Sequence, residues 1–253
     1  MSETKQPIRY SLIDAIRAVA IINMIVYHLC YDIFFVFGVW EDFILSTPLY
    51  IWERLICCTF IIVSGMSMNF SRHGYRRGII VNLCGFLITI VTVLISPDQA
   101  VWFGILNFLG CAMLITFALR HELSRIKPIV GMAVFFILFM LFYGIPDRFI
   151  GVFSYPLIPL PDALYQYRWL SFLGFLSDDF FSADYFPLLR WIFLYLFGYQ
   201  LWRFIAEKGY DRCFTKRIPV LDFIGRHSLI IYLIHQPVLY GVCYVIFTLS
   251  VSV

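Results

Sequence analysis

The first long apolar stretch of the chain carries residue types that could perform acid–base chemistry. If the stretch is helical, its ionisable side chains share one stripe about 80° wide, because each residue turns a helix by about 100°. His28 and Asp32 lie four residues apart, so the carboxylate can hold one imidazole nitrogen and leave the other basic. This spacing predicts a general base. The stripe consists of Asp14, Arg17, Ile21, Met24, His28 and Asp32.

Later apolar stretches also carry polar residues. Because an ionisable group inside a bilayer is costly, such residues predict a functional seam that crosses the membrane between the first, second, fourth, sixth and seventh stretches. The structural alternative is hydrogen bonding between helices, which is the favoured interpretation for Ser64, Ser67, Asn69 and Asn82. For His235 both interpretations stay open. The predicted seam adds Ser228, Tyr232 and His235 on one face of the last stretch, and Glu53, Arg54, Asn107, Asp184 and Arg190 near the depth of His28.

The composition predicts an all-α, polytopic membrane protein. The 253 residues are 61% hydrophobic and 14% charged, against about 25% charged in a typical soluble domain. Stretches of about 20 apolar residues are long enough to span a bilayer. Seven such segments predict about seven transmembrane helices in a single domain over residues 1–253: Tyr10 to Phe37, Pro48 to Phe70, Gly78 to Ser96, Val101 to Leu119, Pro128 to Ile145, Phe186 to Ile205 and Ser228 to Leu249.

The distribution of charge predicts the orientation. Lys5, Arg9 and most other basic residues fall at the amino terminus and in the even-numbered connections, and only Arg148 and Arg168 fall in the odd ones. Basic loops stay in the cytoplasm, so we expect a cytoplasmic amino terminus, an outer carboxyl terminus and a multi-pass protein of the bacterial inner, or plasma, membrane. The connection over residues 146–185 is then an extracytoplasmic loop. Acidic residues concentrate in the odd connections: Glu41, Asp42, Asp98, Asp147, Asp162, Asp178, Asp179 and Asp184.

Net charge and cysteine spacing exclude other classes. The net charge of +3 is small, and the basic residues do not alternate with polar loops as a nucleic-acid surface would require, so we expect no nucleic-acid partner. The seven cysteines lie mostly inside apolar runs without metal-ligand spacing, and no metal is expected.

Two runs of residues resemble one family. Asp14 to Ile22, followed by His28 eleven residues after Arg17, resembles the opening helix of the transmembrane acyltransferases. The run Gly225 to Pro237 resembles the short bacterial branch related to heparan-alpha-glucosaminide N-acetyltransferase. Further stretches with this resemblance are Ser64 to Ser67, Phe103 to Asn107 and Asp184 to Leu188.

The resemblance implies an enzyme that moves an acetyl (acyl) group from cytoplasmic acetyl-CoA to a glycan-like hydroxyl or amine outside. His28 would be the catalytic histidine, assisted by Asp32, and Arg17 would meet the donor. Asp14, Ser228, Tyr232 and His235 complete the expected donor side, and Glu53, Arg54, Asn107, Asp184 and Arg190 the acceptor side.

The expected partners are membrane lipid and an extracytoplasmic glycan or small-molecule acceptor. Better-known members of the family have more spans, which leaves a homodimer open. Two other functions remain as alternatives: a transporter or permease that uses the same seam, and a non-catalytic membrane partner.

Overall fold

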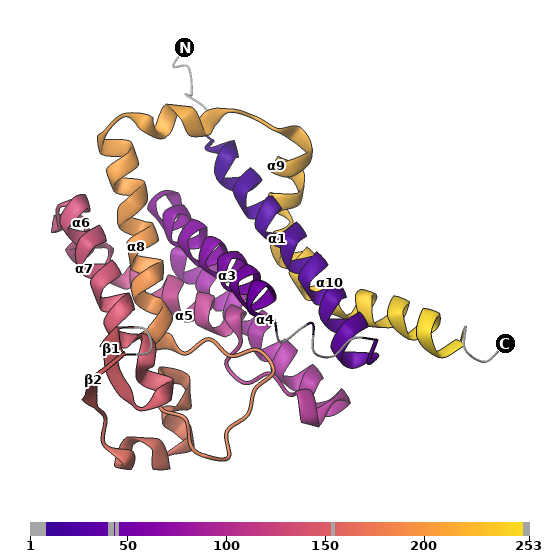
Figure 1. The fold of residues 1–253 in the computed structure, drawn as a ribbon. Helices are drawn as coiled ribbons and strands as arrows, with labels where there is room; N and C mark the ends of the chain where they lie inside the picture. Colours follow the sequence, from indigo (N-terminus) through magenta and orange to yellow (C-terminus); the bar gives the residue numbers. More distant parts are fainter. Residues whose placement is uncertain (1–8, 40–42, 44–45, 153–154, 250–253) are drawn as a thin grey trace. The chain divides into compact units, whose positions relative to one another are not determined.

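A computed structural model describes residues 9–39, 43, 46–152 and 155–249, with the side chains of 248 and 249 left out. Helices make up 78% of the structure, so the protein is nearly all-α, as predicted, with a small two-stranded sheet (Figure 1). Lys5, Glu41 and Asp42, which entered the charge argument, lie outside the described residues.

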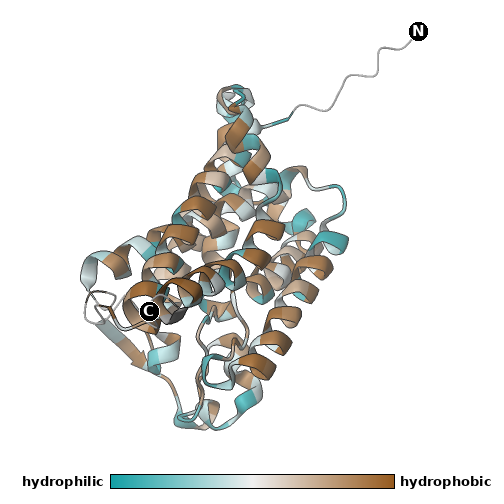
Figure 2. Cartoon of the chain, turned by 90° about the vertical axis from the view of Figure 1, so that its right-hand side faces the viewer, coloured by the Kyte–Doolittle hydropathy of each residue, from teal (hydrophilic) through white to brown (hydrophobic). Residues whose placement is uncertain are grey.

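Among the described residues, five helices are long and apolar enough to cross a membrane. Hydrophobic residues run along the helices, and hydrophilic ones gather near their ends (Figure 2). The other two predicted spans are also helical, but one is short and the other carries Arg190, Gln200 and Arg203 among many buried residues. The total of seven spans and the cytoplasmic amino terminus stay predictions. The five helices cover Ser11–Val36, Thr47–Phe70, Gly74–Ile95, Pro128–Asp147 and Ser228–Phe247.

The chain divides into two compact units, and the first combines Met1–Val63 with Lys208–Val253. Within it, α1 packs against α9 and α10, around a small apolar core of Ile21, Met24 and Ile56. The single domain predicted from the sequence stays a prediction. The elements of this unit are α1 (Ser11–Tyr31), the π-helical η1 (Asp32–Val36), most of α3 (Thr47–Ser67), η7 (Tyr210–Thr215), α9 (Pro219–Arg226), α10 (Ser228–Tyr244) and the π-helical η8 (Val245–Leu249).

The second unit covers Ser64–Glu207. Its main pairings are α4 with α5 and α7 with α8. A strip of backbone contact joins α3 to α8, where an added Cβ on Gly65 would lie 2.1 Å from the Tyr195 carbonyl oxygen. Besides the end of α3, the elements are η2 (Met68–Phe70), α4 (Gly74–Ile95), η3 (Pro97–Gln99), α5 (Ile105–Ala118), α6 (Arg120–Arg125), α7 (Pro128–Leu141), η4 (Phe142–Asp147), β1 (Phe149–Val152), β2 (Tyr155–Pro159), η5 (Asp162–Gln166), η6 (Arg168–Leu173) and α8 (Leu188–Glu207).

The long connection before α8 has structure of its own. β1 and β2 form an antiparallel hairpin with an irregular register between Ile150 and Gly151. The Tyr165 hydroxyl donates to the Ile145 carbonyl at 2.5 Å, and burial raises the pKa of Tyr165 to about 12, so the phenol stays protonated near neutral pH.

The two arginines that depart from the charge rule are both neutralised inside this connection. Arg148 pairs with Asp162 and Asp178, and Arg168 pairs with Asp179. The loop therefore carries little unpaired positive charge.

Two segments differ from the sequence prediction. The fourth apolar stretch begins its helix at Ile105 and not Val101, because Phe103 has a positive φ of 52° and the backbone turns there. The sixth connection, predicted as a basic loop, contains η7 and the helix α9. Asp222 and Gly225 of α9 are buried, so this short helix is part of the packed unit.

Candidate active site

The predicted stripe of α1 faces protein. Ile21 and Met24 are buried, Asp32 is fully buried, and His28 is half-buried. The ionisable residues of the stripe contact α9 at one end and α10 at the other. The first unit thus shelters the groups that chemistry would need.

An ion-pair cluster fastens one end of α1. Asp14 accepts hydrogen bonds from Arg17 at 2.9 Å and from Arg9 at 2.7 Å. Arg17 also approaches the Gly225 carbonyl oxygen at 3.5 Å, at the outer limit of a hydrogen bond. The side chains of Asp14 and Arg17 are 16% and 15% exposed. Arg17 is therefore held in place and lies beside backbone of α9.

Two histidines meet further along α1. The ring centroids of His28 and His235 lie 5.0 Å apart, with the planes inclined at 53°. Nδ1 of His235 lies 2.6 Å from the Tyr232 carbonyl oxygen. Since a carbonyl only accepts, Nδ1 carries the proton and Nε2 keeps a basic lone pair in the neutral ring. That Nε2 is buried and has no hydrogen-bond partner among the described residues.

Asp32 is tied to α10 and not to His28. Its Oδ1 accepts a hydrogen bond from Nε2 of Gln236 at 2.8 Å, while its buried Oδ2 has no partner among the described residues. The direct carboxylate–imidazole bond expected from the spacing of His28 and Asp32 is absent from the described structure, because the carboxylate turns to the amide of the neighbouring helix. His235 therefore contacts His28, and its neighbour Gln236 contacts Asp32.

Aromatic side chains pack next to the two histidines. The ring of Tyr27 meets His28 edge-on at 5.9 Å and Trp52 at 5.8 Å. The indole of Trp52 donates to Oδ1 of Asn23 at 3.1 Å. Tyr232 lies 5.3 Å from His235. These aromatic rings therefore pack around both imidazoles.

The remaining predicted residues of the first unit have different surroundings. Glu53 and Arg54 are adjacent on α3 and form a loose ion pair at 3.8 Å, and Arg54 lies over the ring of Tyr50 at 4.9 Å. Ser228 is half-buried at the first position of α10. No hydrogen bond joins these three residues to the histidine pair in the described part of the chain.

Asn107, Asp184 and Arg190 belong to the second unit, and each is engaged there. Asn107 donates to the side chain of Asn82 at 3.3 Å. The carboxylate of Asp184 accepts from the Ile105 amide at 3.1 Å, and so caps the first turn of α5. Arg190 stacks over the ring of Tyr143 at 3.3 Å. Their expected role toward an acceptor stays a prediction.

Sequence reasoning missed Gln236. Gln236 follows His235 directly in the sequence. A polar amide beside a histidine that faces the first helix could have indicated a second polar contact with that helix. Asn82 of α4 pairs with Asn107 of α5, which agrees with the interhelical hydrogen bonding favoured for Asn82; Oδ1 of Asn107 is buried and has no partner among the described residues. Groups of three or more possible metal ligands are absent among the described residues.

The apolar helices define an integral membrane protein, and its first unit holds a histidine pair. The chain matches the family described as heparan-alpha-glucosaminide N-acetyltransferase, catalytic, over residues 9–237. It therefore belongs to that family, which confirms the resemblance and identifies a membrane transferase. No curated protein and no solved structure matches the chain.

Proposed function

We propose that the protein is a membrane-bound acyltransferase that moves an acetyl group from cytoplasmic acetyl-CoA to a hydroxyl or amine of an extracytoplasmic, glycan-like acceptor. Membership of the family supports the reaction class. The observation that carries the site is the contact of His28 with His235, whose Nε2 is a sheltered base without a partner among the described residues.

The chemistry needs one base and one placed donor. An imidazole nitrogen takes the proton of the acceptor hydroxyl or amine as the acceptor attacks the thioester carbonyl. The carbon–sulfur bond then breaks, and the thiolate of CoA leaves and recovers a proton from the imidazolium. In the other route, the imidazole of His28 attacks the thioester carbonyl, the carbon–sulfur bond breaks and the thiolate of CoA leaves. The acceptor then attacks the acetyl-imidazole, the carbon–nitrogen bond breaks to regenerate the imidazole, and the acceptor's proton passes to a neighbouring base.

Two neighbouring histidines suit this cycle. The proton accepted by one ring can be shared with the second, and Asp32 supplies negative charge on the same helix as His28. The carboxylate is held by the Gln236 side chain and does not bond His28 directly, so it acts through the position of α10. We assign His28 and Asp32 the catalytic roles and His235 the role of partner base.

Arg17 and Asp14 stand where the donor is expected to enter. Arg17 is eleven residues before His28, which corresponds to about 16 Å along a helix axis. A thin pantetheine arm can cover that gap, while the guanidinium contacts the anionic part of the donor. This placement depends on the proposed topology, which has seven spans and a cytoplasmic amino terminus in a bacterial plasma membrane. Ser228, Tyr232 and His235 complete the proposed donor side.

The acceptor side is proposed to include Glu53, Arg54, Asn107, Asp184 and Arg190. The last three are held by partners of their own in the second unit. Their contribution would then be to shape an entrance, and conservative substitutions at these positions should change KM for the acceptor more than kcat.

The test uses protein purified in detergent and acetyl-CoA labelled on the acetyl group. Binding, hydrolysis and transfer to a panel of amino sugars and neutral sugars are measured for the wild type, His28→Ala and His227→Ala. His227 is a matched control because it is exposed and its ring Nδ1 lies 2.8 Å from the Phe223 carbonyl oxygen, away from the histidine pair. We expect transfer in the wild type and in the control, and loss of about 100-fold or more in His28→Ala.

Two results would contradict the proposal. Uptake of a solute by vesicles that contain the protein, without any binding of acetyl-CoA, would establish the transporter alternative. Full transfer by His28→Ala would remove this histidine from the mechanism, whatever the donor.

A further inference from the structure

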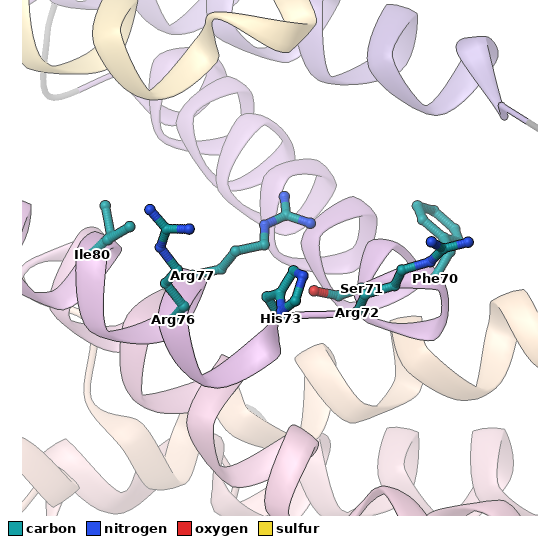
Figure 3. A pocket seen from close by; sticks show the side chains of 7 residues that line it. All are labelled: Phe70, Ser71, Arg72, His73, Arg76, Arg77 and Ile80. Carbon is teal, nitrogen blue, oxygen red and sulfur yellow. The ribbon is translucent and has the colours of Figure 1, made fainter. Parts of the chain in front are cut away.

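A basic cavity opens in the second unit, where α3 ends and α4 begins. It has a volume of about 380 Å³ and is lined by Arg72, Arg76 and Arg77, together with Ser71 and His73. Figure 3 shows Arg76 and Arg77 rising from the first turns of α4 beside His73, and Arg72 extending from the connecting segment. Neither the histidine pair nor the proposed transfer reaction uses these residues.

The three arginines of this cavity carry unpaired charge. None of them forms an ion pair with a carboxylate in the part of the chain that the structure describes. Arg125, Arg148 and Arg168 of the same unit do have acidic partners. A guanidinium group without a carboxylate partner offers a planar set of N–H donors suited to phosphate oxygens.

Two hydroxyl groups, those of Ser71 and Thr116, lie buried at or near this cavity. The Ser71 hydroxyl is buried and lacks a hydrogen-bond partner among the described residues. Ser71 also lines a second cavity of about 80 Å³, together with Thr116. Thr116 is fully buried, and its hydroxyl is likewise without a partner there. Buried hydroxyls normally find a partner, so these two point to a polar ligand.

The other side of the cavity is apolar. Phe70 and Ile80 belong to its lining, and both are more than 40% exposed. Beyond Ile80, α4 presents a continuous exposed apolar face, and only 11% of its membrane-length window is buried. The face consists of Leu83, Phe86, Leu87, Ile90 and Leu94. A ligand with an anionic head and apolar chains fits both surfaces at once.

We propose that this cavity is a binding site for the headgroup of an anionic phospholipid, with the acyl chains lying along the exposed face of α4. A phosphate would accept hydrogen bonds from Arg72, Arg76 and Arg77, and the Ser71 hydroxyl would donate a further one. Basic pockets beside membrane helices recognise anionic headgroups through the same combination of charge and apolar contact.

The experiment measures lipid binding to the full-length protein. Delipidated protein in detergent is titrated with phosphatidic acid, phosphatidylglycerol and phosphatidylcholine of equal chain length, and bound lipid is counted by native mass spectrometry. We compare the wild type, Arg72→Gln/Arg76→Gln/Arg77→Gln, the matching triple Lys variant, Ser71→Ala and Lys127→Gln. The last is the control, because Lys127 is an exposed cation of the same unit outside the cavity.

We expect one anionic lipid to bind in preference to phosphatidylcholine, and affinity to fall by at least about tenfold in the triple Gln variant. The triple Lys variant keeps the charge that membrane insertion requires but loses the planar fork, so its affinity should fall by about threefold or more. Lys127→Gln should bind as the wild type does.

Three results would overturn the proposal. Equal binding of neutral and anionic lipid would show that no headgroup is recognised. Wild-type affinity in both triple variants would place the lipid elsewhere. Displacement of phosphatidic acid by CoA, lost in the triple Gln variant, would assign the cavity to the phosphates of a nucleotide and not to a lipid.

Discussion

At the scale of single residues, the site depends on which partner each buried polar atom finds. Asp32 is 0% exposed, and an uncompensated carboxylate in that position would be costly. Its observed donor is the Gln236 amide. Sequence spacing correctly placed Asp32 on the inward stripe. It could not indicate that the carboxylate turns to α10, because the relative register of two helices is decided by packing and not by local periodicity.

The hydrogen bond from Gln236 to Asp32 should contribute to the stability of the protein. Gln236→Leu removes the donor of Asp32 and should lower the free energy of unfolding by about 1–3 kcal/mol, since a buried acceptor loses its partner. The double variant Asp32→Leu/Gln236→Leu should regain most of that loss, because no polar group remains unpaired. Thermal unfolding in detergent measures both. A Gln236→Leu variant as stable as the wild type would show that the contact does not form.

At the scale of elements, close backbone approach holds α9 against α1. An added Cβ on Gly225 would lie 1.9 Å from the Asp14 carbonyl oxygen and 2.6 Å from its carbon. Backbone atoms cannot yield as side chains do, so a methyl group at this position forces the helices apart. The same helix α9 was missed from the sequence, because its eight residues begin at a proline and lie between basic residues that resemble a solvated loop.

The matching prediction is that Gly225→Ala destabilises the protein by about 1–3 kcal/mol and disturbs the neighbouring Asp14–Arg17 pair. Gly241→Ala is the control, because nothing lies within 4 Å of its added Cβ, and a helical Ala is favoured over Gly by up to about 1 kcal/mol. Melting temperatures in the same detergent compare the two. Equal stability of both variants would contradict the close packing of α9.

The long helices were predictable from sequence because their apolar runs match the thickness of a bilayer. The boundaries of α5 were less predictable, since the positive φ of Phe103 and the cap from Asp184 come from residues that lie far apart in sequence. The sequence predicted the two histidines but not their contact. Helical periodicity placed His28 and His235 on inward faces, but only tertiary packing could bring the rings to 5.0 Å.

At the scale of the whole molecule, the predicted topology separates donor and acceptor. Tyr155 lies in the connection predicted to be outside and is 77% exposed, whereas the exposed Cys213 lies in one predicted to be cytoplasmic. In sealed cells, a membrane-impermeant maleimide should label Tyr155→Cys in a Cys213→Ser background. Native Cys213 should react only after permeabilisation. Labelling of Cys213 in sealed cells would reverse the orientation.

In the proposed mechanism, His28 and His235 act together in acyl transfer. The most direct measurement is a double-mutant cycle on kcat/KM for labelled acetyl transfer, with His28→Ala, His235→Ala and the double variant, each checked for folding by its melting temperature. If the two rings form one catalytic unit, each single variant loses about 100-fold or more and the double variant loses little beyond that. If the loss of kcat/KM in the double variant equals the product of the two single losses, the two rings act independently. A single variant that keeps the wild-type kcat/KM would likewise show that the pair is not the catalytic unit.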